Sequence, residues 1–328
     1  MTTRWMITNR AVRGGVPGIR RGDRSYWMSS SDRRLDRLSD WTEVTARVFQ
    51  RELLAAAQAL PRVNDPLHQH EDQKHVCLFV HGYNNSWIDA VLRYDQVSRD
   101  LFDGERGLGL SVLFSWPSDG MLAGYVPDRV DADHSADDVA QVLVDLHDYQ
   151  VAMQRLAMKD PSAACQVKIS AIAHSMGNYV MQQGVARAWT RANRPALVSL
   201  FSQLLMVAAD VDNDLFACGE SSDGSPGEAI ANLCYRVTAL YSGRDPALAA
   251  SAGLKHFGKR RLGRSGLDRA HAPPDNVWDY DCTPLLGNAD TAAVHSAYFT
   301  EIATQRLMVD VLRGLDRAVV VGRVNSRG

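Results

Sequence analysis

Apolar runs alternate with segments of helical period along most of the chain. Short uninterrupted apolar runs are typical of strands buried on both faces, and apolar residues at three- and four-residue intervals are typical of helices. The runs that predict strands lie at residues 5–8, 26–28, 76–80, 110–114, 167–173, 204–208, 237–241 and 277–280. Helices are predicted at residues 44–60, 87–101, 137–158 and 179–189, with a final helix that begins near His295.

Strands that are separated by helices are usually parallel. We therefore predict an α/β fold, a doubly wound, mostly parallel sheet with helices on both faces. A single domain is expected over residues 1–328, with N-terminal strands and a helix in residues 1–73 and the core in residues 74–314. Residues 117–136 contain glycines and prolines and are a candidate for a small lid, although an ordinary surface loop fits them at least as well.

Polar residues follow several of the predicted strands. In open α/β sheets the ligand crevice lies outside the carboxyl ends of the strands. The residues placed there are His81, Trp116, Ser175, Asp210, Asp245 and His295. So many polar residues at strand ends are harder to explain by chance than any single motif. We therefore expect the functional site at this edge of the sheet.

Ser175 follows the apolar run at residues 167–173 and precedes a helical segment. Small residues, Ala173 and Gly177, lie two positions before and after it. A nucleophilic serine on a sharp strand-to-helix turn needs small residues there, because larger side chains would collide with the neighbouring strand and helix. The usual pattern is G-x-S-x-G, and alanine replaces the first glycine here. Taken alone, the pattern also fits a serine in an ordinary loop.

A nucleophilic serine needs a base to accept its proton and a carboxylate to orient that base. His256, His271 and His295 follow the serine turn in the sequence. We favour His295 because it lies between the last strand and the last helix, from where a loop can return it to the serine. The other two histidines lie in a basic segment and in a proline-containing loop.

Two aspartates compete for the role of the acid. Asp245 follows a strand in a Gly-Arg-Asp-Pro turn, and Asp210 ends the preceding strand. We favour Asp245, which is nearer to His295 in the sequence, and keep Asp210 as the alternative acid. Residues 210–214 also resemble the start of a calcium loop, but Leu215 occupies the position that requires glycine, so calcium is rejected.

Acyl transfer at a serine also requires backbone N–H groups that stabilise the oxyanion. The amide of Met176 is one candidate because it follows the nucleophile directly. The amide of Tyr83 is the other, because Gly82 lets the loop after residues 76–80 approach the serine. Further candidates for the pocket wall are His81, Asn84, Trp116 and His174. Trp116 fits an acyl pocket and the core equally well.

The chain has 36 Lys and Arg against 38 Asp and Glu, for a formal net charge of −2. This balance gives no sign of a nucleic-acid partner. No window approaches the ~20 apolar residues needed to span a bilayer, and no signal-peptide pattern opens the sequence. The five cysteines are widely spaced and include no C-x-x-C, which favours a reducing compartment and a cytoplasmic location.

No cofactor and no metal are expected. Residues 68–72 hold two histidines and two acids, but this polar segment lacks a partner group and is interpreted as a solvated loop. The expected partner is a small-molecule ester, with no integral membrane segment and an oligomeric state that the sequence leaves open.

The motifs together resemble those of the α/β-hydrolase superfamily and, more narrowly, a bacterial esterase/lipase-like group of largely uncharacterised proteins. The matching segments run in order over nearly the whole chain. They are residues 5–10 (Trp-Met-Ile-Thr-Asn-Arg), 79–86 (Phe-Val-His-Gly-Tyr-Asn-Asn-Ser), 114–118 (Phe-Ser-Trp-Pro-Ser), 173–178 (Ala-His-Ser-Met-Gly-Asn), 208–212, 245–248 and 295–298. The resemblance implies the triad Ser175, Asp245 and His295, with Tyr83 and Met176 as oxyanion donors.

The leading hypothesis is a serine hydrolase that cleaves carboxylic esters through an acyl-Ser175 intermediate. An acyltransferase or thioesterase would use the same intermediate. A non-catalytic binding module on the same fold is the alternative from a different class. Because one fold hosts many chemistries, the sequence does not set the acyl chain length or the alcohol group.

Overall fold

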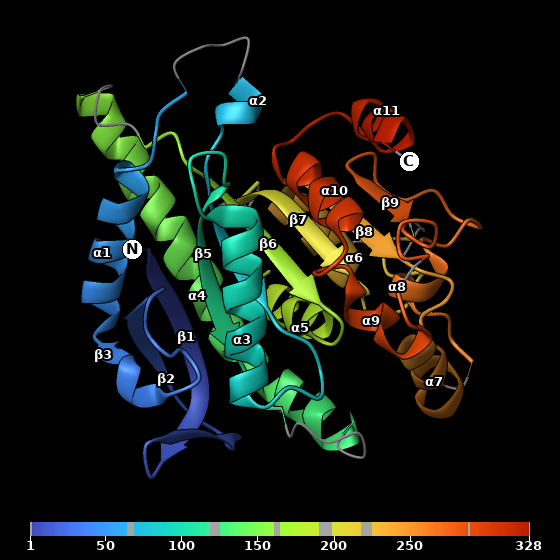
Figure 1. Cartoon of the computed structure of the whole chain (residues 1–328), viewed down its shortest axis with the longest axis horizontal. Helices are drawn as coiled ribbons and strands as arrows, with labels where there is room; N and C mark the ends of the chain where they lie inside the picture. The colour runs from blue at the N-terminus through green and yellow to red at the C-terminus, as the bar shows by residue number, and fades with distance from the viewer. Residues whose placement is uncertain are drawn as a thin grey trace.

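One nine-stranded β-sheet runs through the part of the chain that the structure describes (Figure 1). The computed structural model describes residues 2–63, 69–118, 125–160, 165–189, 199–217, 225–256, 258–287 and 289–327. The strands are β1 (Thr3–Arg13), β2 (Val16–Ser30), β3 (Thr42–Val44), β4 (His75–Val80), β5 (Gly109–Ser115), β6 (Lys168–His174), β7 (Phe201–Val207), β8 (Cys234–Tyr241) and β9 (Val277–Asp281).

The strand order is β3-β2-β1-β5-β4-β6-β7-β8-β9. Every pair from β1 to β9 along this order is parallel, and only the two pairs that involve β2 are antiparallel. The order reverses between β5 and β6, on either side of β4, as expected for a doubly wound sheet. The predicted fold class is therefore confirmed.

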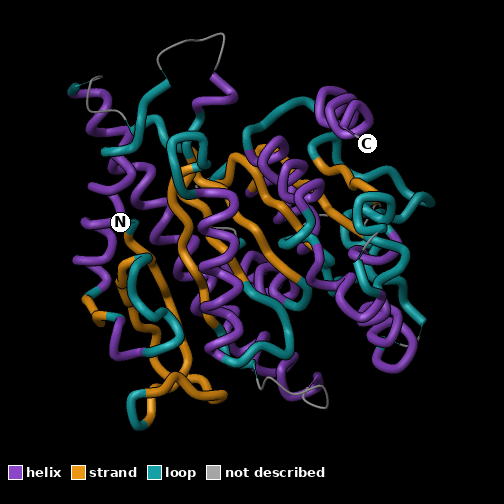
Figure 2. The backbone as a smooth tube through the Cα atoms, viewed as in Figure 1, coloured by secondary structure: helices purple, strands orange, loops and turns teal. Residues whose placement is uncertain are grey.

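Helices cover both faces of the sheet, which appears as a continuous band between them in Figure 2. The α-helices are α1 (Ala46–Gln58), α2 (Gln69–Asp72), α3 (Trp87–Val97), α4 (Tyr125–Lys159), α5 (Gly177–Ala188), α6 (Pro226–Leu233), α7 (Pro246–Lys255), α8 (Leu262–Ser265), α9 (Val294–Ala297), α10 (Ile302–Leu312) and α11 (Arg317–Arg327). Short 3₁₀ segments lie at Leu38–Asp40 and Thr291–Ala293, and a π-helical segment, Ser98–Phe102, extends α3.

Strand β4 illustrates how the two apolar cores form. Leu78 and Val80 point to the core that α1, α4, α5 and α6 cover, whereas Cys77 and Phe79 point to the core under α3, α10 and α11. Successive side chains on a strand face opposite sides of the sheet. A strand buried on both sides is therefore apolar throughout, which explains the uninterrupted apolar runs in the sequence.

The N-terminal strands are much longer than their apolar runs predict. The segment between residues 8 and 26 is rich in glycine and arginine and lies between the two predicted strands, but β1 and β2 pair through most of it. Gly14 and Gly15 form the turn with φ angles of +59° and +76°. Two successive positive φ angles fit the tight hairpin turns that match the twist of the strands. Because β1 also pairs with β5, residues 3–44 extend the same sheet.

Helix α4 begins at Tyr125 rather than near Asp137. Pro127 lies in its first turn, where proline is tolerated because that N–H has no partner in the helix. Residues 125–136 of the predicted lid segment therefore belong to a helix. Residues 119–124 of that segment lie outside the described residues, and the lid itself stays a prediction.

The final predicted helix is two helices. His295 lies in the four-residue α9, and α10 begins after a break at residues 298–301. None of the helices in the described ranges is both long enough and apolar enough to cross a membrane.

Candidate active site

Ser175 lies on the turn between the end of β6 and the start of α5, with a φ angle of +53°. This left-handed conformation is costly for a residue other than glycine and persists only where the surroundings enforce it. Two backbone hydrogen bonds do so. The Ser175 N–H donates to the Val207 carbonyl at 2.9 Å, and the Ser175 carbonyl accepts from the Asp210 N–H at 3.1 Å. The sharp turn that the sequence predicts is therefore present.

Close backbone approach explains the small residues around this turn. A Cβ on Gly177 would lie 2.5 Å from the carbonyl oxygen of His81, which is closer than real Cβ contacts. A Cβ on Gly82 would lie 2.7 Å from the Cβ of Ser175. The loop after β4 and the serine turn are thus packed directly against each other, and glycine is required on both sides of the contact.

His295 connects Ser175 to Asp245. Its Nε2 lies 2.8 Å from the Ser175 Oγ, and its Nδ1 lies 2.7 Å from the Asp245 Oδ2. The residues are separated by 120 and 50 positions in the sequence. Helix α9 and the start of α7 bring the imidazole and the carboxylate to the carboxyl end of β6. We refer to this arrangement as the serine–histidine–aspartate series.

Two contacts hold Asp245 in place. It is the N-cap of α7, and its Oδ1 accepts the N–H of Leu248 at 3.1 Å. Its side chain is fully buried, which leaves Oδ2 facing His295. Burial lowers the pKa of His295, but the charge of Asp245 and its hydrogen bond outweigh burial, so the pKa lies above the ordinary value. The carboxylate therefore stabilises the imidazolium that forms when His295 accepts a proton.

Asp210, the alternative acid, has different partners. Its Oδ1 accepts hydrogen bonds from the Arg261 Nε and the Ser251 Oγ, both at 2.8 Å. Arg261 is almost fully buried and forms a second ion pair with Asp212. Of the two candidate acids, the structure brings Asp245 onto the Nδ1 of His295, whereas Asp210 compensates a buried guanidinium.

Tyr83 and Met176, the predicted oxyanion donors, belong to two different segments near the serine. Met176 follows Ser175 directly and is the N-cap residue of α5. Tyr83 belongs to the loop after β4 and lines the cavity beside Ser175. The N-terminus of the 12-residue α5 carries partial positive charge from the aligned peptide dipoles. An anion that develops next to Ser175 would therefore meet favourable electrostatics.

His81 and Trp116 form one rigid unit. Their rings stack at 5.3 Å, the Trp116 Nε1–H donates to the His81 carbonyl, and the Trp116 N–H donates to the His81 Nε2. Burial lowers the pKa of His81 to about 3, so its imidazole is neutral. Trp116 is fully buried and is not among the residues that line the cavity, which assigns it to the core.

His174 directly precedes Ser175, and Asn84 belongs to the loop after β4. The His174 Nε2 lies 2.9 Å from the His295 carbonyl oxygen, and burial holds the pKa of His174 well below its ordinary value. A neutral imidazole with a proton on Nε2 therefore donates to that carbonyl and anchors the backbone of His295. Asn84 has a φ of +58° and also lines the cavity.

A cavity of about 300 Å³ opens beside Ser175, and we refer to it as the Ser175 cavity. Most of its walls come from the loop after β4 and from α3, α7 and α9. The described residues that line it are His81, Gly82, Tyr83, Asn84, Asn85, Arg93, His174, Ser175, Asp210, Ala247, Leu248, Ala250, Ser251, His295 and Ser296. Sequence reasoning missed the contributions of Arg93, Ser251 and Ser296, because they lie on helices whose orientation no motif reveals.

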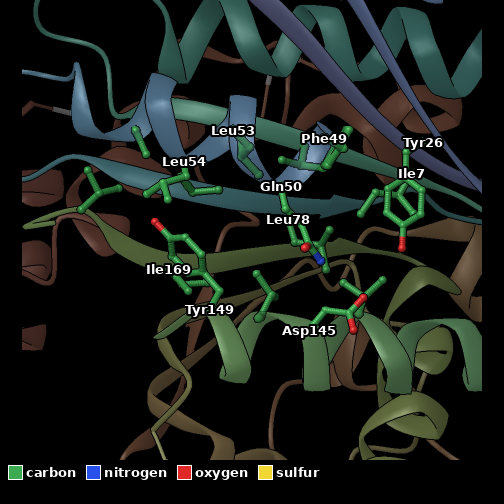
Figure 3. Close-up of a pocket in the computed structure, with 16 residues that line it drawn as sticks. Ile7, Tyr26, Phe49, Gln50, Leu53, Leu54, Leu78, Asp145, Tyr149 and Ile169 are labelled. Atoms are coloured by element: carbon green, nitrogen blue, oxygen red, sulfur yellow. The ribbon is translucent and has the colours of Figure 1, made fainter. Parts of the chain in front are cut away.

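A second cavity, of about 90 Å³, lies between α1 and α4 (Figure 3). We refer to it as the α1–α4 cavity. Leu53 and Leu54 reach it from α1, Tyr149 from α4, and Leu78 from the sheet. Among the described residues that line it there is no serine, cysteine or histidine. It therefore offers mainly apolar surface and no serine, cysteine or histidine that could act as the Ser175 site does.

The described residues hold no group of three or more His, Cys, Asp or Glu side chains that could bind a metal ion. In the polar segment at residues 68–72, His68 lies outside the described residues, and His70 contacts the Arg313 carbonyl at 3.2 Å. The expectation that no cofactor is needed stays a prediction.

Comparisons with known proteins extend this picture. A family model described as "Alpha/beta hydrolase of unknown function (DUF900)" matches residues 56–273. The comparison with curated proteins gave no match. Similar solved structures include Aspergillus fumigatus lipase B, with 14% identity and a TM-score of 0.37, covering 83% of this chain and 61% of that chain.

Two further structures cover more of their own length. The esterase domain of a Rhodothermus marinus protein has 13% identity and a TM-score of 0.33, covering 93% of this chain and 99% of that one. Esterase B from Lactobacillus rhamnosis has 11% identity and a TM-score of 0.38, covering 95% and 86%. This chain spans about 61% of the length of the Aspergillus lipase. These likenesses are too remote to assign an activity.

Proposed function

We propose that this chain, which belongs to the family of α/β-hydrolases of unknown function (DUF900), is a serine hydrolase that cleaves carboxylic esters. The family gives the hydrolase class, and the ester chemistry is our proposal. The observation that carries it is the serine–histidine–aspartate series, with contacts of 2.8 and 2.7 Å at the end of β6. A nucleophile, a base within hydrogen-bond reach and a third group that orients the base are the parts that acyl transfer at a serine requires.

In the first step, the Ser175 Oγ attacks the ester carbonyl while the Nε2 of His295 takes the hydroxyl proton. For this, Nε2 must be unprotonated and the proton of the neutral ring must lie on Nδ1. The Asp245 Oδ2, 2.7 Å from Nδ1, favours that tautomer and stabilises the imidazolium. The imidazolium then gives its proton to the leaving alcohol as the C–O bond breaks, leaving an acyl-Ser175.

We assign oxyanion stabilisation to the backbone N–H groups of Met176 and Tyr83. The packing of Gly82 against the Cβ of Ser175, where an added methyl would lie 2.7 Å away, supports this assignment because it brings the loop that carries Tyr83 close to the nucleophile. Donors fixed in place before the reaction act without reorganisation, and one such donor is typically worth about 3 kcal/mol of barrier.

Deacylation repeats the same steps with water. His295 takes a proton from water, the hydroxide attacks the acyl carbonyl, and the proton returns to Ser175 as the carboxylic acid leaves. The cavity of about 300 Å³ favours small esters, because it lies at the lower end of the range for small-molecule sites. Acyl transfer would use the same acyl-Ser175 with an alcohol in place of water, and product analysis with added alcohols distinguishes the two reactions.

The test is labelling of the folded protein with a fluorophosphonate, together with hydrolysis of p-nitrophenyl esters of graded chain length. We expect one adduct on Ser175 and loss of both labelling and turnover in Ser175→Ala. Ser202→Ala, in the neighbouring β7 and outside the Ser175 cavity, is the matched control and should label normally. An unlabelled Ser175 in folded protein, or full esterase activity in Ser175→Ala, would overturn the proposal.

A further inference from the structure

Arg93 is the only lysine or arginine among the described residues that line the Ser175 cavity. It lies in the second half of α3, the helix that follows the loop carrying Tyr83. Two of the three histidines in the wall add no charge, because burial lowers the pKa values of His81 and His174 far enough to keep both rings neutral. The third is His295, the proposed base. The guanidinium is therefore the main permanent positive charge in the described wall of this cavity.

Two contacts hold the guanidinium in place. Its Nη1 donates to the Gln96 Oε1 at 2.9 Å, and the Gln96 Nε2 donates in turn to the Phe299 carbonyl at 3.1 Å. The guanidinium carbon also lies 5.5 Å from the centre of the Phe299 ring. The same ring packs edge-on against His174 at 5.2 Å, and His174 directly precedes Ser175. The positive charge is thus held in place, and contacts through Phe299 and His174 connect it to the nucleophile.

No carboxylate in the described part of the chain forms an ion pair with Arg93, because the nearby acids have other partners. Asp89, one turn earlier on α3, accepts from Ser86 in a capping box. Asp95 pairs with Arg4 and Arg99. At the cavity wall, Asp210 pairs with Arg261, and Asp245 faces His295.

Arg93 is therefore a half-buried cation without a compensating anion in the described structure. Burial lowers the pKa of its guanidinium, which nevertheless stays charged at neutral pH. A contact with one aromatic face recovers only part of the cost of removing a guanidinium from water. An arginine fork is well suited to bind a carboxylate or a phosphate through two parallel hydrogen bonds.

We propose that Arg93 binds an anionic group on the substrate, so that the esters cleaved at Ser175 carry a carboxylate or a phosphate. This inference rests on the proposed function and adds the substrate class to it. The anion can belong to the acyl part or to the alcohol part of the ester, and the two cases require different substrates in the test.

The kinetic test compares matched pairs of esters. On the acyl side, p-nitrophenyl hydrogen glutarate is compared with neutral p-nitrophenyl valerate. On the alcohol side, 2-(butyryloxy)ethyl phosphate is compared with neutral 2-methoxyethyl butyrate. We expect the wild type to prefer the anionic member of at least one pair. In Arg93→Met, kcat/KM for that member should fall by about 10- to 100-fold, with the neutral member changed less than about threefold.

Two further variants separate charge from packing. Arg93→Lys keeps the charge but loses the fork, so it should recover part of the activity on the anionic ester. Arg99→Met removes an exposed arginine from the following π-helical segment and should change neither member of a pair. Equal losses on anionic and neutral esters in Arg93→Met would overturn the inference and leave Arg93 a packing residue. Ser175-dependent hydrolysis could then still stand.

A binding measurement does not depend on turnover. Monomethyl glutarate, an anion, and dimethyl glutarate, its neutral analogue, are titrated into Ser175→Ala by calorimetry. We expect the anion to bind at least about tenfold more tightly, and Arg93→Met in the same background to abolish the difference. This result would support the anion site even if Ser175 proved inert. Equal affinity for both probes with Arg93 intact, together with no preference for the anionic member of either ester pair, would contradict it.

Discussion

The Ser175 cavity and the α1–α4 cavity both lie against the same sheet, but they differ in what surrounds them. The α1–α4 cavity is walled mainly by aliphatic and aromatic side chains from two helices and the sheet (Figure 3). The Ser175 cavity gathers a hydroxyl, an imidazole and a guanidinium from segments far apart in the sequence. Apolar surface shows where a small molecule could fit, whereas convergence of polar groups shows where chemistry can occur.

Backbone strain distinguishes the two regions as well. Four non-glycine residues of the described chain have positive φ angles, and three of them follow the carboxyl ends of strands β4, β6 and β7. They are Asn84, Ser175 and Ala208. No such residue lines the α1–α4 cavity. Strain of this kind costs about 1–3 kcal/mol per residue and is concentrated at functional sites. We therefore predict that substitutions at the catalytic groups of the Ser175 cavity mainly lower activity, whereas substitutions at the α1–α4 cavity mainly lower stability.

The largest effect is expected from the two competing acids. Asp245→Asn leaves a group of the same size but no longer favours the reactive tautomer of His295, so kcat should fall about 10⁴-fold. Asp210→Asn should lower kcat by less than about tenfold. It should instead lower the midpoint of thermal unfolding, because it removes a charge paired with buried Arg261. Steady-state kinetics and thermal unfolding of both variants measure this, and the reverse ranking would identify Asp210 as the acid.

The α1–α4 cavity should behave as core. Leu78→Ala removes a buried side chain of β4 that lines it and should lower the free energy of unfolding by about 2–5 kcal/mol. The kcat/KM of the folded fraction should stay within about twofold of wild type. Urea unfolding and ester hydrolysis under native conditions give the two values. A large loss of kcat/KM without a loss of stability would show that this cavity takes part in function.

Gly82→Ala tests the contact between the loop after β4 and the serine turn. The added methyl would lie 2.7 Å from the Cβ of Ser175, so one segment must move. A displacement near 1 Å at a reacting group can cost about 100-fold in rate. The matched control is Gly253→Ala on α7, where the structure has nothing within 4 Å of the added methyl. An active Gly82→Ala variant would show that this close packing is not needed for catalysis.

The smallest effect is expected on stability in acid. It involves two buried histidines, His75 at the amino end of β4 and His81 just after its carboxyl end. Burial lowers the pKa values of His75 and His81 to about 3, whereas the ordinary value is 6.5. Below pH 6.5 the unfolded chain binds protons that the folded chain does not, so each histidine destabilises the fold by up to about 1.4 kcal/mol per pH unit. His295 acts oppositely, because its raised pKa favours the folded state below pH 6.5.

Urea unfolding of wild type and His75→Leu at pH 7.5 and 5.5 checks this expectation. His75 lies at the amino end of β4, and neither of its ring nitrogens has a hydrogen-bond partner among the described residues. Its replacement should make stability less sensitive to acid and leave kcat/KM unchanged. If the free energy of unfolding depended on pH identically in both proteins, His75 would take up its proton in the folded state as readily as in the unfolded chain.

The sequence predicted those parts of the fold that depend on burial and on sharp turns. The central residues of strands β4 to β8 are largely apolar because both faces are covered, and the serine turn needs Gly177 because the backbone of His81 approaches within contact distance. The long β1–β2 hairpin was missed because its outer half is exposed and rich in arginine. The apolar pattern places the start of α4 about 12 residues too late, because the first turns of this helix contain a proline and several acids.

The residues of the candidate site also fall into those that the sequence predicts and those that it does not. Ser175, Asp245 and His295 each follow a strand, so the rule that ligands bind at the carboxyl ends of parallel strands brings them together. Arg93 and Ser251 lie within helices, and whether such a side chain faces the cavity depends on the rotation of the helix against the sheet. Packing of the whole molecule sets that rotation, and no short motif encodes it.

Acylation of Ser175 with the help of His295 is the step on which all of the proposed chemistry depends. The most direct measurement is rapid mixing of the protein with p-nitrophenyl acetate, acid quenching within milliseconds, and mass spectrometry of the peptides. We expect an acetyl group on Ser175 that forms as fast as the burst of p-nitrophenol, decays at the turnover rate, and is absent in His295→Ala. Turnover without an acetylated Ser175, or acetylation at unchanged rate in His295→Ala, would contradict it.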